Sequence, residues 1–162
     1  SAQYLAAEVF RSMAGIEATI VPYKTSADVI RALRTGEVHA IFETIAPVIP
    51  HAKAGTVRLL GVTETQRFPN LPNVPTIAES GLPNYEIVGW NGIAVPKRTP
   101  LDVINKLNAD INSAVLQPDI RQKFLDLGVI ARGNTPEQMT ALLKKDIAWW
   151  QNVIEKAKIS KQ

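Results

Sequence analysis

Two short segments of this sequence combine small residues with hydroxyl groups in a pattern that suits a bound carboxylate. They are Ser1-Ala2-Gln3 and Thr25-Ser26-Ala27, and each precedes an apolar-periodic stretch that is typical of a helix. The first turn of a helix presents unpaired backbone N–H groups and a partial positive charge, which together bind an anion. Lys24 adds a cation beside the second segment. The alternative is that both segments only cap their helices.

Histidine, cysteine and carboxylate patterns offer little support for other chemistry. His39 and His51 are the only histidines, and the chain has no cysteine. Without cysteine or an HExxH-like spacing we expect neither a metal site nor a cofactor. A rival hypothesis is a small acid–base enzyme that pairs Glu43 with His51.

Helices and strands are predicted to alternate along the first half and to position these segments. The predicted helices run from Ser1 to just before Gly15, over Thr25–Arg34 and over Pro47–Ala54, with Gly36 and Gly55 after the last two. The predicted strands are Glu17–Pro22, Val38–Phe42 and Val57–Thr63. This order favours an α/β fold with a largely parallel sheet, in which ligands bind at the carboxyl edge of the strands.

The second half is predicted to be rich in helices and poor in strands. Its helices begin at Pro100, span Pro118–Leu127 and begin at Thr135, while its strands are Tyr85–Val95 and Val129–Ala131. The apolar faces of these helices are broad, and a domain normally buries such faces on a sheet. We therefore expect these helices to pack on the first lobe, or on a sheet supplied by residues outside this chain.

A proline-rich segment, Arg67–Pro96, lies between the two halves. Prolines fix the backbone and remove N–H donors, so they exclude a long helix or a central strand there. The segment lacks the Gly/Ser composition of a flexible linker. We interpret it as a shaped connection, or hinge, between two structural units.

The overall composition is that of an ordinary globular protein. The chain has 162 residues, 46% hydrophobic and 20% charged, with a formal net charge of +3. Basic residues alternate with acidic ones and form no single cluster, so we expect no nucleic-acid partner. No run is long and apolar enough for a transmembrane segment, and no signal peptide is visible in this sequence.

Several segments together resemble one known family. They are AAEVF, VPYK, PHAKAGTVRLLGVT, RFPNLPNVPTIAESGLPNYE, GWNGIAVP, TPLDVINKLNADIN and TPEQMTALLKKDIAWW. The chain resembles, over essentially its whole length, the periplasmic substrate-binding receptors of tripartite tricarboxylate transporters, also called Bug receptors. The proline-rich segment with GWNG is the most specific part of this resemblance.

The resemblance implies a fragment of a Venus flytrap, the periplasmic-binding-protein-like α/β fold with two lobes. The chain would correspond to the C-terminal portion of a longer receptor. Residues 1–85 would form most of the second lobe, which is a mostly complete parallel α/β lobe. Residues 86–162 would supply a crossover strand and C-terminal helices of the first lobe, whose N-terminal part is absent. The protein would be periplasmic, and its signal peptide would lie outside this chain.

The resemblance also implies a function. The receptor would capture a small organic acid, often a dicarboxylate, and deliver it to a membrane permease without catalysis. Ser1, Thr25 and Ser26 would donate to a ligand carboxylate together with the amides of Ala2 and Ala27. The residues expected to line the cleft are Tyr23, Lys24, Glu43 and Thr44. The family commonly has glycine where this chain has Thr25, and an Asp-Asn pair where this chain has Glu43-Thr44. The identity of the ligand therefore cannot be carried over from the family to this chain.

A third hypothesis is a protein-interaction module that uses its exposed helical faces. Uncovered apolar faces larger than a few hundred Å² drive association. We therefore expect the chain as given to self-associate or to dimerise.

Overall fold

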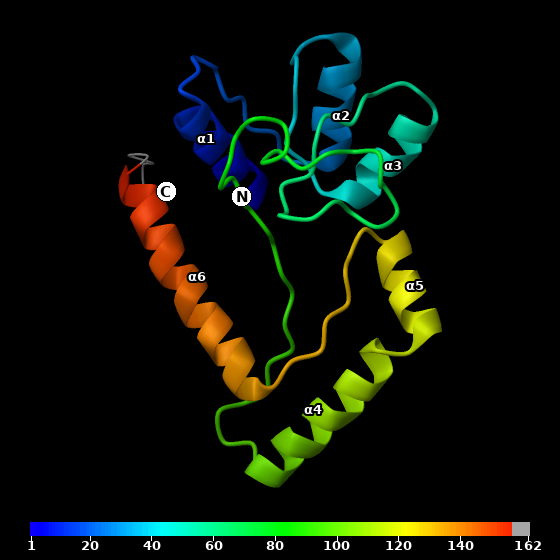
Figure 1. The fold of residues 1–162 in the computed structure, drawn as a ribbon, viewed down its shortest axis with the longest axis vertical. Helices are drawn as coiled ribbons and strands as arrows, with labels where there is room; N and C mark the ends of the chain where they lie inside the picture. Colours follow the sequence, from blue (N-terminus) through cyan, green and yellow to red (C-terminus); the bar gives the residue numbers. More distant parts are fainter. Residues whose placement is uncertain (157–162) are drawn as a thin grey trace. The chain divides into compact units, whose positions relative to one another are not determined.

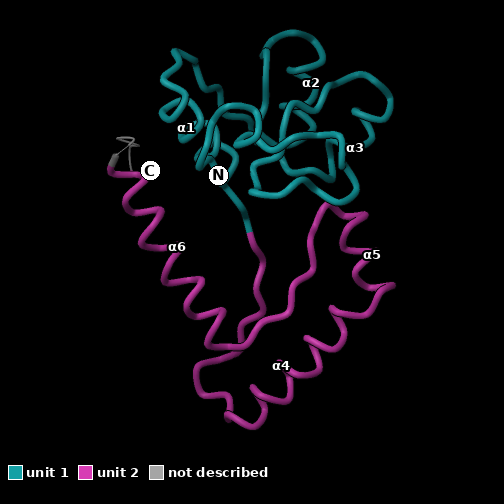
Figure 2. The backbone as a smooth tube through the Cα atoms, in the orientation of Figure 1, with its two compact units in different colours: residues 1–89 teal, residues 90–162 magenta. Residues whose placement is uncertain are grey.

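The computed structural model describes residues 1–156 and divides into two compact units, residues 1–89 and 90–162 (Figure 2). Unit 1 carries helices α1 (Ala2–Ala14), α2 (Ser26–Thr35) and α3 (Ile45–Lys53), as Figure 1 shows. Unit 2 carries α4 (Leu101–Val115), α5 (Pro118–Asp126) and α6 (Pro136–Lys156). Residues 157–162, at the end of the predicted second part, lie outside the described residues. The predicted assignment of residues 1–85 and 86–162 to two lobes stays a prediction.

The ends of the helices follow local sequence signals. Ser1 and Thr25 are the N-caps of α1 and α2, and each hydroxyl accepts from a backbone N–H three residues later. Gly15 and Gly36 end the same helices with φ of 62° and 78°. This left-handed conformation is strained for residues with a Cβ, which explains glycine at both positions. The predicted helices are confirmed, with ends that shift by one or two residues.

The core of unit 1 surrounds the side chain of Tyr85. This ring packs edge-on against Phe10, with a centroid distance of 5.9 Å, and Phe10 also contacts Phe42 at 5.5 Å. The Tyr85 hydroxyl donates a buried 2.9 Å hydrogen bond to the carbonyl oxygen of Ala6 in α1. Burial raises the pKa of Tyr85 well above its usual range. The remaining buried apolar residues come from all three helices and from the connections: Ala6, Val9, Ile30, Ala32, Val48, Val62, Phe68 and Ile87.

The predicted strands are wrong for this structure. Within residues 1–156 the strand pairing is limited to one parallel bridge, between Val62 and Thr76. Val62 donates to the carbonyl of Pro75, and Ile77 donates back to Val62. On one side the ladder cannot continue because Pro75 has no N–H, and on the other the N–H of Glu79 bonds to the Thr76 hydroxyl. Apolar composition alone therefore did not produce a sheet, since each strand needs a neighbouring backbone with free donors and acceptors.

Two side chains close the proline-rich segment into a compact loop. The Arg67 Nε donates to both carboxylate oxygens of Glu79, at 2.9 and 3.2 Å, and Arg67 Nη1 donates to the carbonyl of Pro72. Glu79 also accepts from the backbone N–H of Thr76 at 2.7 Å, while the Thr76 hydroxyl accepts from the Glu79 N–H. These bonds fix a segment whose prolines leave few backbone donors of its own.

In unit 2, three asparagines hold the chain ahead of α6 against α4. Asn112 Nδ2 and Asn108 Nδ2 both donate to the carbonyl of Asn134, and the Asn134 N–H donates to Asn112 Oδ1. A Cβ at Gly133 would lie 2.7 Å from Asn112 Oδ1, so any larger residue there would displace the Asn112 side chain from its present position. The next residues form the predicted capping box, since Thr135 and Gln138 exchange hydrogen bonds between side chain and backbone.

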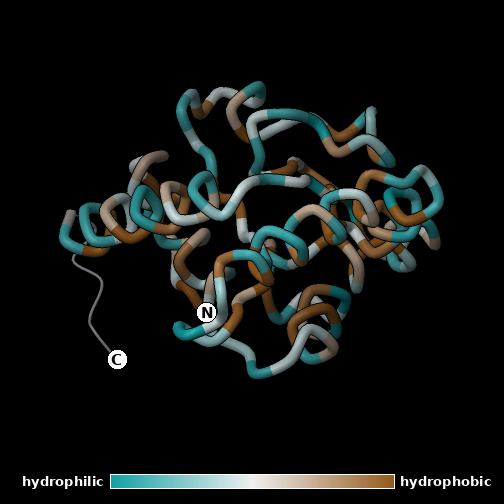
Figure 3. The backbone as a smooth tube through the Cα atoms, turned by 90° about the horizontal axis from the view of Figure 1, so that it is seen from below, coloured by the Kyte–Doolittle hydropathy of each residue, from teal (hydrophilic) through white to brown (hydrophobic). Residues whose placement is uncertain are grey.

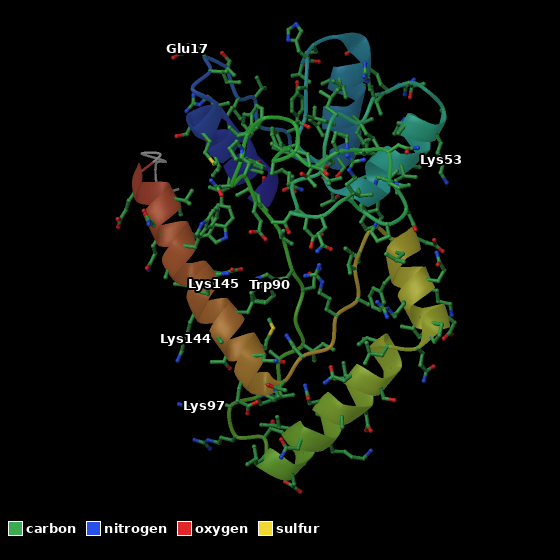
Figure 4. All side chains as sticks on the ribbon, viewed as in Figure 1. Glu17, Lys53, Trp90, Lys97, Lys144 and Lys145 are labelled. Atoms are coloured by element: carbon green, nitrogen blue, oxygen red, sulfur yellow. The ribbon has the colours of Figure 1, made fainter. Side chains whose placement is uncertain are left out.

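The GWNG segment packs on α6. The indole N–H of Trp90 donates to Asp146, and the ring lies on the α6 side of the chain (Figure 4). A Cβ at Gly92 would lie 2.7 Å from the Met139 methyl carbon, so the backbone approaches α6 closely at this glycine. These contacts explain two of the four residues of the motif by packing within unit 2.

Unit 2 buries little apolar surface. Helices α4 and α5 have no buried residue, and every buried apolar residue of the described chain belongs to unit 1. Unit 2 by itself therefore gives its helical faces little apolar cover, and their packing on the first lobe or on a sheet outside this chain stays a prediction. Within residues 1–156, none of the helices is both long and apolar enough to cross a bilayer.

Replacing Tyr85 by phenylalanine tests the contribution of its buried hydrogen bond. Tyr85→Phe keeps the ring but removes the donor to Ala6, so the free energy of unfolding should fall by about 0.5–1.5 kcal/mol in urea denaturation. The control is Tyr23→Phe, which removes an exposed hydrogen bond to Glu37 and should change the stability little. Equal effects of the two substitutions would contradict the role assigned to Tyr85.

The ion pair between Arg67 and Glu79 predicts that the free energy of unfolding depends on pH. The Thr76 N–H and the Arg67 guanidinium hold the pKa of Glu79 below its usual value. Because the folded pKa is the lower one, the stabilisation is complete above the unfolded pKa and is lost as the pH falls through the folded pKa. Urea midpoints of the wild type and of Glu79→Gln should differ at neutral pH and converge in acid. A difference that is constant with pH would refute this assignment.

Candidate functional site

The start of α1 combines a capped turn with free backbone donors. The Ser1 hydroxyl accepts from the Tyr4 N–H at 3.3 Å, which leaves its own proton available for donation. The N–H groups of Ala2 and Gln3 lie in the first turn, where no helical acceptor exists for them. Ser1 and Ala2 are exposed. The predicted donors at this helix start are therefore accessible.

The start of α2 is already occupied in part by its own side chains. The Thr25 hydroxyl accepts from the Asp28 N–H at 3.1 Å and donates to the Asp28 carboxylate at 2.7 Å. A hydroxyl has one proton, so Thr25 cannot donate to a ligand while it bonds to Asp28. The Ser26 hydroxyl and the Ser26 and Ala27 amides form no hydrogen bond with other described residues. They are the better donors at this helix start.

Glu43 joins the start of α1 to the start of α3. Its Oε1 accepts from Gln3 Nε2 at 3.1 Å and from the Thr44 N–H and hydroxyl at 2.7 and 3.1 Å. Thr44 is the N-cap of α3, so two helix starts meet at one carboxylate. Sequence reasoning did not place Gln3 beside Glu43, because no local pattern links residues forty positions apart.

Tyr23 and Lys24 precede α2 without a hydrogen bond to that cluster. Tyr23 donates to Glu37 at 2.8 Å, and this bond raises the pKa of Tyr23. Among the described residues, no hydrogen bond joins residues 23–27 to Ser1, Glu43 or Thr44. Hydrogen bonds therefore link Glu43 and Thr44 to each other and, through Gln3, to the first turn of α1. Tyr23, Lys24, Thr25, Ser26 and Ala27 follow one another in the sequence at the start of α2.

The members of the rival acid–base pair, Glu43 and His51, lie at opposite ends of α3. His51 lies in the last turn of α3, whereas Glu43 precedes the first. Six residues of helix separate Ile45 from His51, which is about 9 Å along the axis, and Glu43 lies two residues further back. Glu43 and His51 therefore lie near opposite ends of α3, and Glu43 accepts its hydrogen bonds from Gln3 and Thr44. The described residues also contain no group of three or more histidines and carboxylates that could hold a metal ion.

A shallow, open depression lies elsewhere on unit 1, along the second half of α1. Inside it, Glu8 is buried and accepts from Tyr4 and Arg11 at 2.7 and 2.6 Å. The hydrogen bond that Tyr4 donates to Glu8 raises the pKa of Tyr4. The residues that line the depression are Glu8, Arg11, Glu17, Ala18, Thr19 and Ile20. The depression includes none of the predicted site residues, and its one buried carboxylate is already paired.

Comparison with known families identifies the chain. A sequence model described as the tripartite tricarboxylate transporter family receptor matches residues 1–159. The chain belongs to this receptor family. The resemblance found in its sequence motifs is thus confirmed.

Curated relatives agree with this assignment. A UPF0065 protein in the tcbD-tcbE intergenic region of Pseudomonas sp. (strain P51) is 38% identical over 152 residues, covering 93% of this chain and 45% of the relative. The protein BugT of Bordetella pertussis is 30% identical, with 95% and 47% covered. A shorter UPF0065 protein of Pseudomonas knackmussii is 34% identical and is covered over 90% of its length.

Solved structures of receptors share the fold. A structure titled R. palustris Rpa4515 with adipate has a TM-score of 0.86 and 34% identity, with 99% of this chain and 54% of that chain covered. MatC from Rhodopseudomonas palustris with bound malate has a TM-score of 0.73 and 29% identity, covering 95% and 53%. The structure of the periplasmic binding protein BugD has a TM-score of 0.77 at 26% identity.

These matches confirm the fold class, a periplasmic-binding-protein-like fragment. The chain spans about half the length of most relatives and of the solved structures that it matches. That it corresponds to their C-terminal portion, and how its two units form lobes, stay predictions.

The N-caps of α2 and α3 provide a matched test of local structure. Thr25 caps α2 through its side chain, whereas the Thr44 hydroxyl makes no cap hydrogen bond to α3. Thr25→Ala should lower the free energy of unfolding by about 1 kcal/mol, and Thr44→Ala should lower it much less. Thermal or urea unfolding of the two variants measures the difference. A larger loss for Thr44→Ala would show that the caps are wrongly assigned.

Proposed function

We propose that this chain is part of a periplasmic receptor that binds a small carboxylate and delivers it to a tripartite membrane transporter. The observation that carries the proposal is the family match over residues 1–159, together with a structural neighbour at a TM-score of 0.86 that holds adipate. A second neighbour holds malate. Both of these ligands are dicarboxylates, so we propose a dicarboxylate or a related organic acid for this chain.

The proposed carboxylate site is built from the starts of α1 and α2. Unpaired amides in a first helical turn bind a carboxylate without a dedicated cation. Ser1 and Ser26 would donate through their hydroxyls, and Ala2 and Ala27 through their amides. Thr25 would contribute mainly by holding the turn, because its proton is donated to Asp28. Lys24 would add charge.

Glu43, Thr44 and Tyr23 would line the rest of the cleft. Glu43 accepts three hydrogen bonds through one oxygen, Oε1, in the described structure. Its other oxygen can accept from a hydroxyl or an amino group of the ligand, or from Lys24. A second carboxylate placed directly against Glu43 would be repelled.

We further propose that the receptor is not an enzyme. The family and the neighbours are substrate-binding proteins, and the separation of Glu43 from His51 along α3 argues against acid–base catalysis. The proposed location is the periplasm, where neighbours such as BugD are described as binding proteins. The membrane permease would be a transient partner.

Titration calorimetry of the chain with organic acids tests the proposal. Adipate, malate and related acids should bind, and Ser26→Ala should weaken the binding about tenfold or more, because a hydrogen bond to a charged group is lost. The control is Ser12→Ala, on an exposed position in the body of α1, which should leave the affinity unchanged. Binding of sugars or metal cations, with no binding of any organic acid, would refute the proposal.

A further inference from the structure

The GWNG motif contains the one asparagine of this chain that is followed by glycine, Asn91. Hydropathy changes from residue to residue along the connections as well as the helices (Figure 3), and within the apolar run Ile87–Val95 Asn91 is the one strongly hydrophilic residue. Packing on α6 explains Trp90 and Gly92 but gives Asn91 no role. Asn91 is exposed, and its side chain forms no hydrogen bond with another residue within 1–156.

The backbone N–H that follows Asn91 is free as well. The amide nitrogen of Gly92 makes no hydrogen bond with another described residue, and Gly92 is exposed. Both residues lie outside the helices, in the connection that leads to α4. Glycine has no Cβ, so its nitrogen can approach the preceding side chain with little steric hindrance. Two adjacent groups that are both free and exposed are well placed for an intramolecular reaction.

We propose that Asn91-Gly92 is a site of spontaneous deamidation. The Gly92 nitrogen attacks Asn91 Cγ, and the new bond closes a succinimide ring. The bond from Cγ to Nδ2 breaks, and Nδ2 leaves as ammonia with the proton that the Gly92 nitrogen gives up. One water then opens the ring. Opening at Cγ gives aspartate, whereas opening at the backbone carbonyl of residue 91 gives isoaspartate, whose main chain is longer by a methylene.

The consequence of this reaction lies in the packing of unit 2. Trp90 donates to Asp146, and the backbone at Gly92 closely approaches Met139, so Asn91 lies between two contacts with α6. A methylene inserted in the main chain changes the separation of these contacts, and the two cannot both keep their present geometry. The aspartate product adds a negative charge but keeps the length of the backbone. Isoaspartate therefore loosens the attachment to α6, whereas aspartate leaves it in place.

Peptide mapping of the folded 162-residue chain, after incubation at mildly alkaline pH, tests the site. Trypsin releases residues 68–97 as one peptide, which carries four asparagines: Asn70, Asn73, Asn84 and Asn91. Asn91 should convert several-fold faster than the other three, which precede leucine, valine and tyrosine. Its rate should rise with pH, because the attacking nitrogen must lose a proton, and isoaspartate-specific methylation should label the product. No conversion, or earlier conversion of another asparagine, would overturn the proposal.

The same chain unfolded in urea separates the effect of the structure from that of the sequence. Since both reacting groups are free in the folded structure, the folded chain should deamidate within several-fold of the unfolded rate. Asn91→Gln is the control. It keeps an amide, but its longer side chain closes a ring less readily, so the peptide should stay unmodified at this position. Strong protection of Asn91 in the folded chain would show that the structure does not leave this site open.

Hydrogen exchange tests the consequence for α6. The backbone amides near Met139 and Asp146 should exchange several-fold faster in the isoaspartate form, once it is separated by chromatography, than in the unmodified chain. Asn91→Asp is the matched control, because it carries the same added charge on a backbone of unchanged length, and it should exchange like the unmodified chain. Equal exchange in the isoaspartate form and in Asn91→Asp would refute the role assigned to the length of the backbone.

Discussion

The ring of Tyr85 is the contact on which the order of unit 1 depends. It is almost fully buried, it packs on Phe10, and its hydroxyl bonds to the Ala6 carbonyl in α1. The segment before it is rich in proline and forms almost no backbone ladder, so it gains little order from its own hydrogen bonds. One large side chain thus attaches the end of that segment to the first helix. The ion pair between Arg67 and Glu79 then fixes the proline-rich loop that precedes Tyr85.

The two units reach order by different means. Unit 1 buries apolar side chains from three helices around an aromatic cluster. Unit 2 relies on directional contacts at a few points, namely the asparagine bonds around Asn134 and the packing of Trp90 and Gly92 on α6. Hydrogen bonds of this kind define geometry but contribute only modest net stability in water. Within unit 2 itself the faces of α4 and α5 have no buried residue.

The candidate site shows how capping and ligand binding compete for the same groups. At α2 the Thr25 hydroxyl donates its proton to the Asp28 carboxylate, and at α3 the Glu43 carboxylate accepts from the Thr44 N–H at the helix start. A carboxylate ligand would need the donors that these side chains leave free, which are the amides of the first turns and the serine hydroxyls. Internal acids near helix starts therefore restrict where a ligand carboxylate can bind.

The helices, their caps and the family were determined by the sequence itself, because they rest on local patterns. Serine, threonine and glycine satisfy backbone groups within a few residues, as at Ser1, Thr25 and Gly15. Tertiary structure alone decided three features: the hydrogen bond between Gln3 and Glu43, the buried position of Tyr85 against α1, and the absence of the predicted strands from the described residues. A strand depends on a partner that is distant in sequence, and at the Val62–Thr76 bridge that pairing ended because Pro75 has no donor.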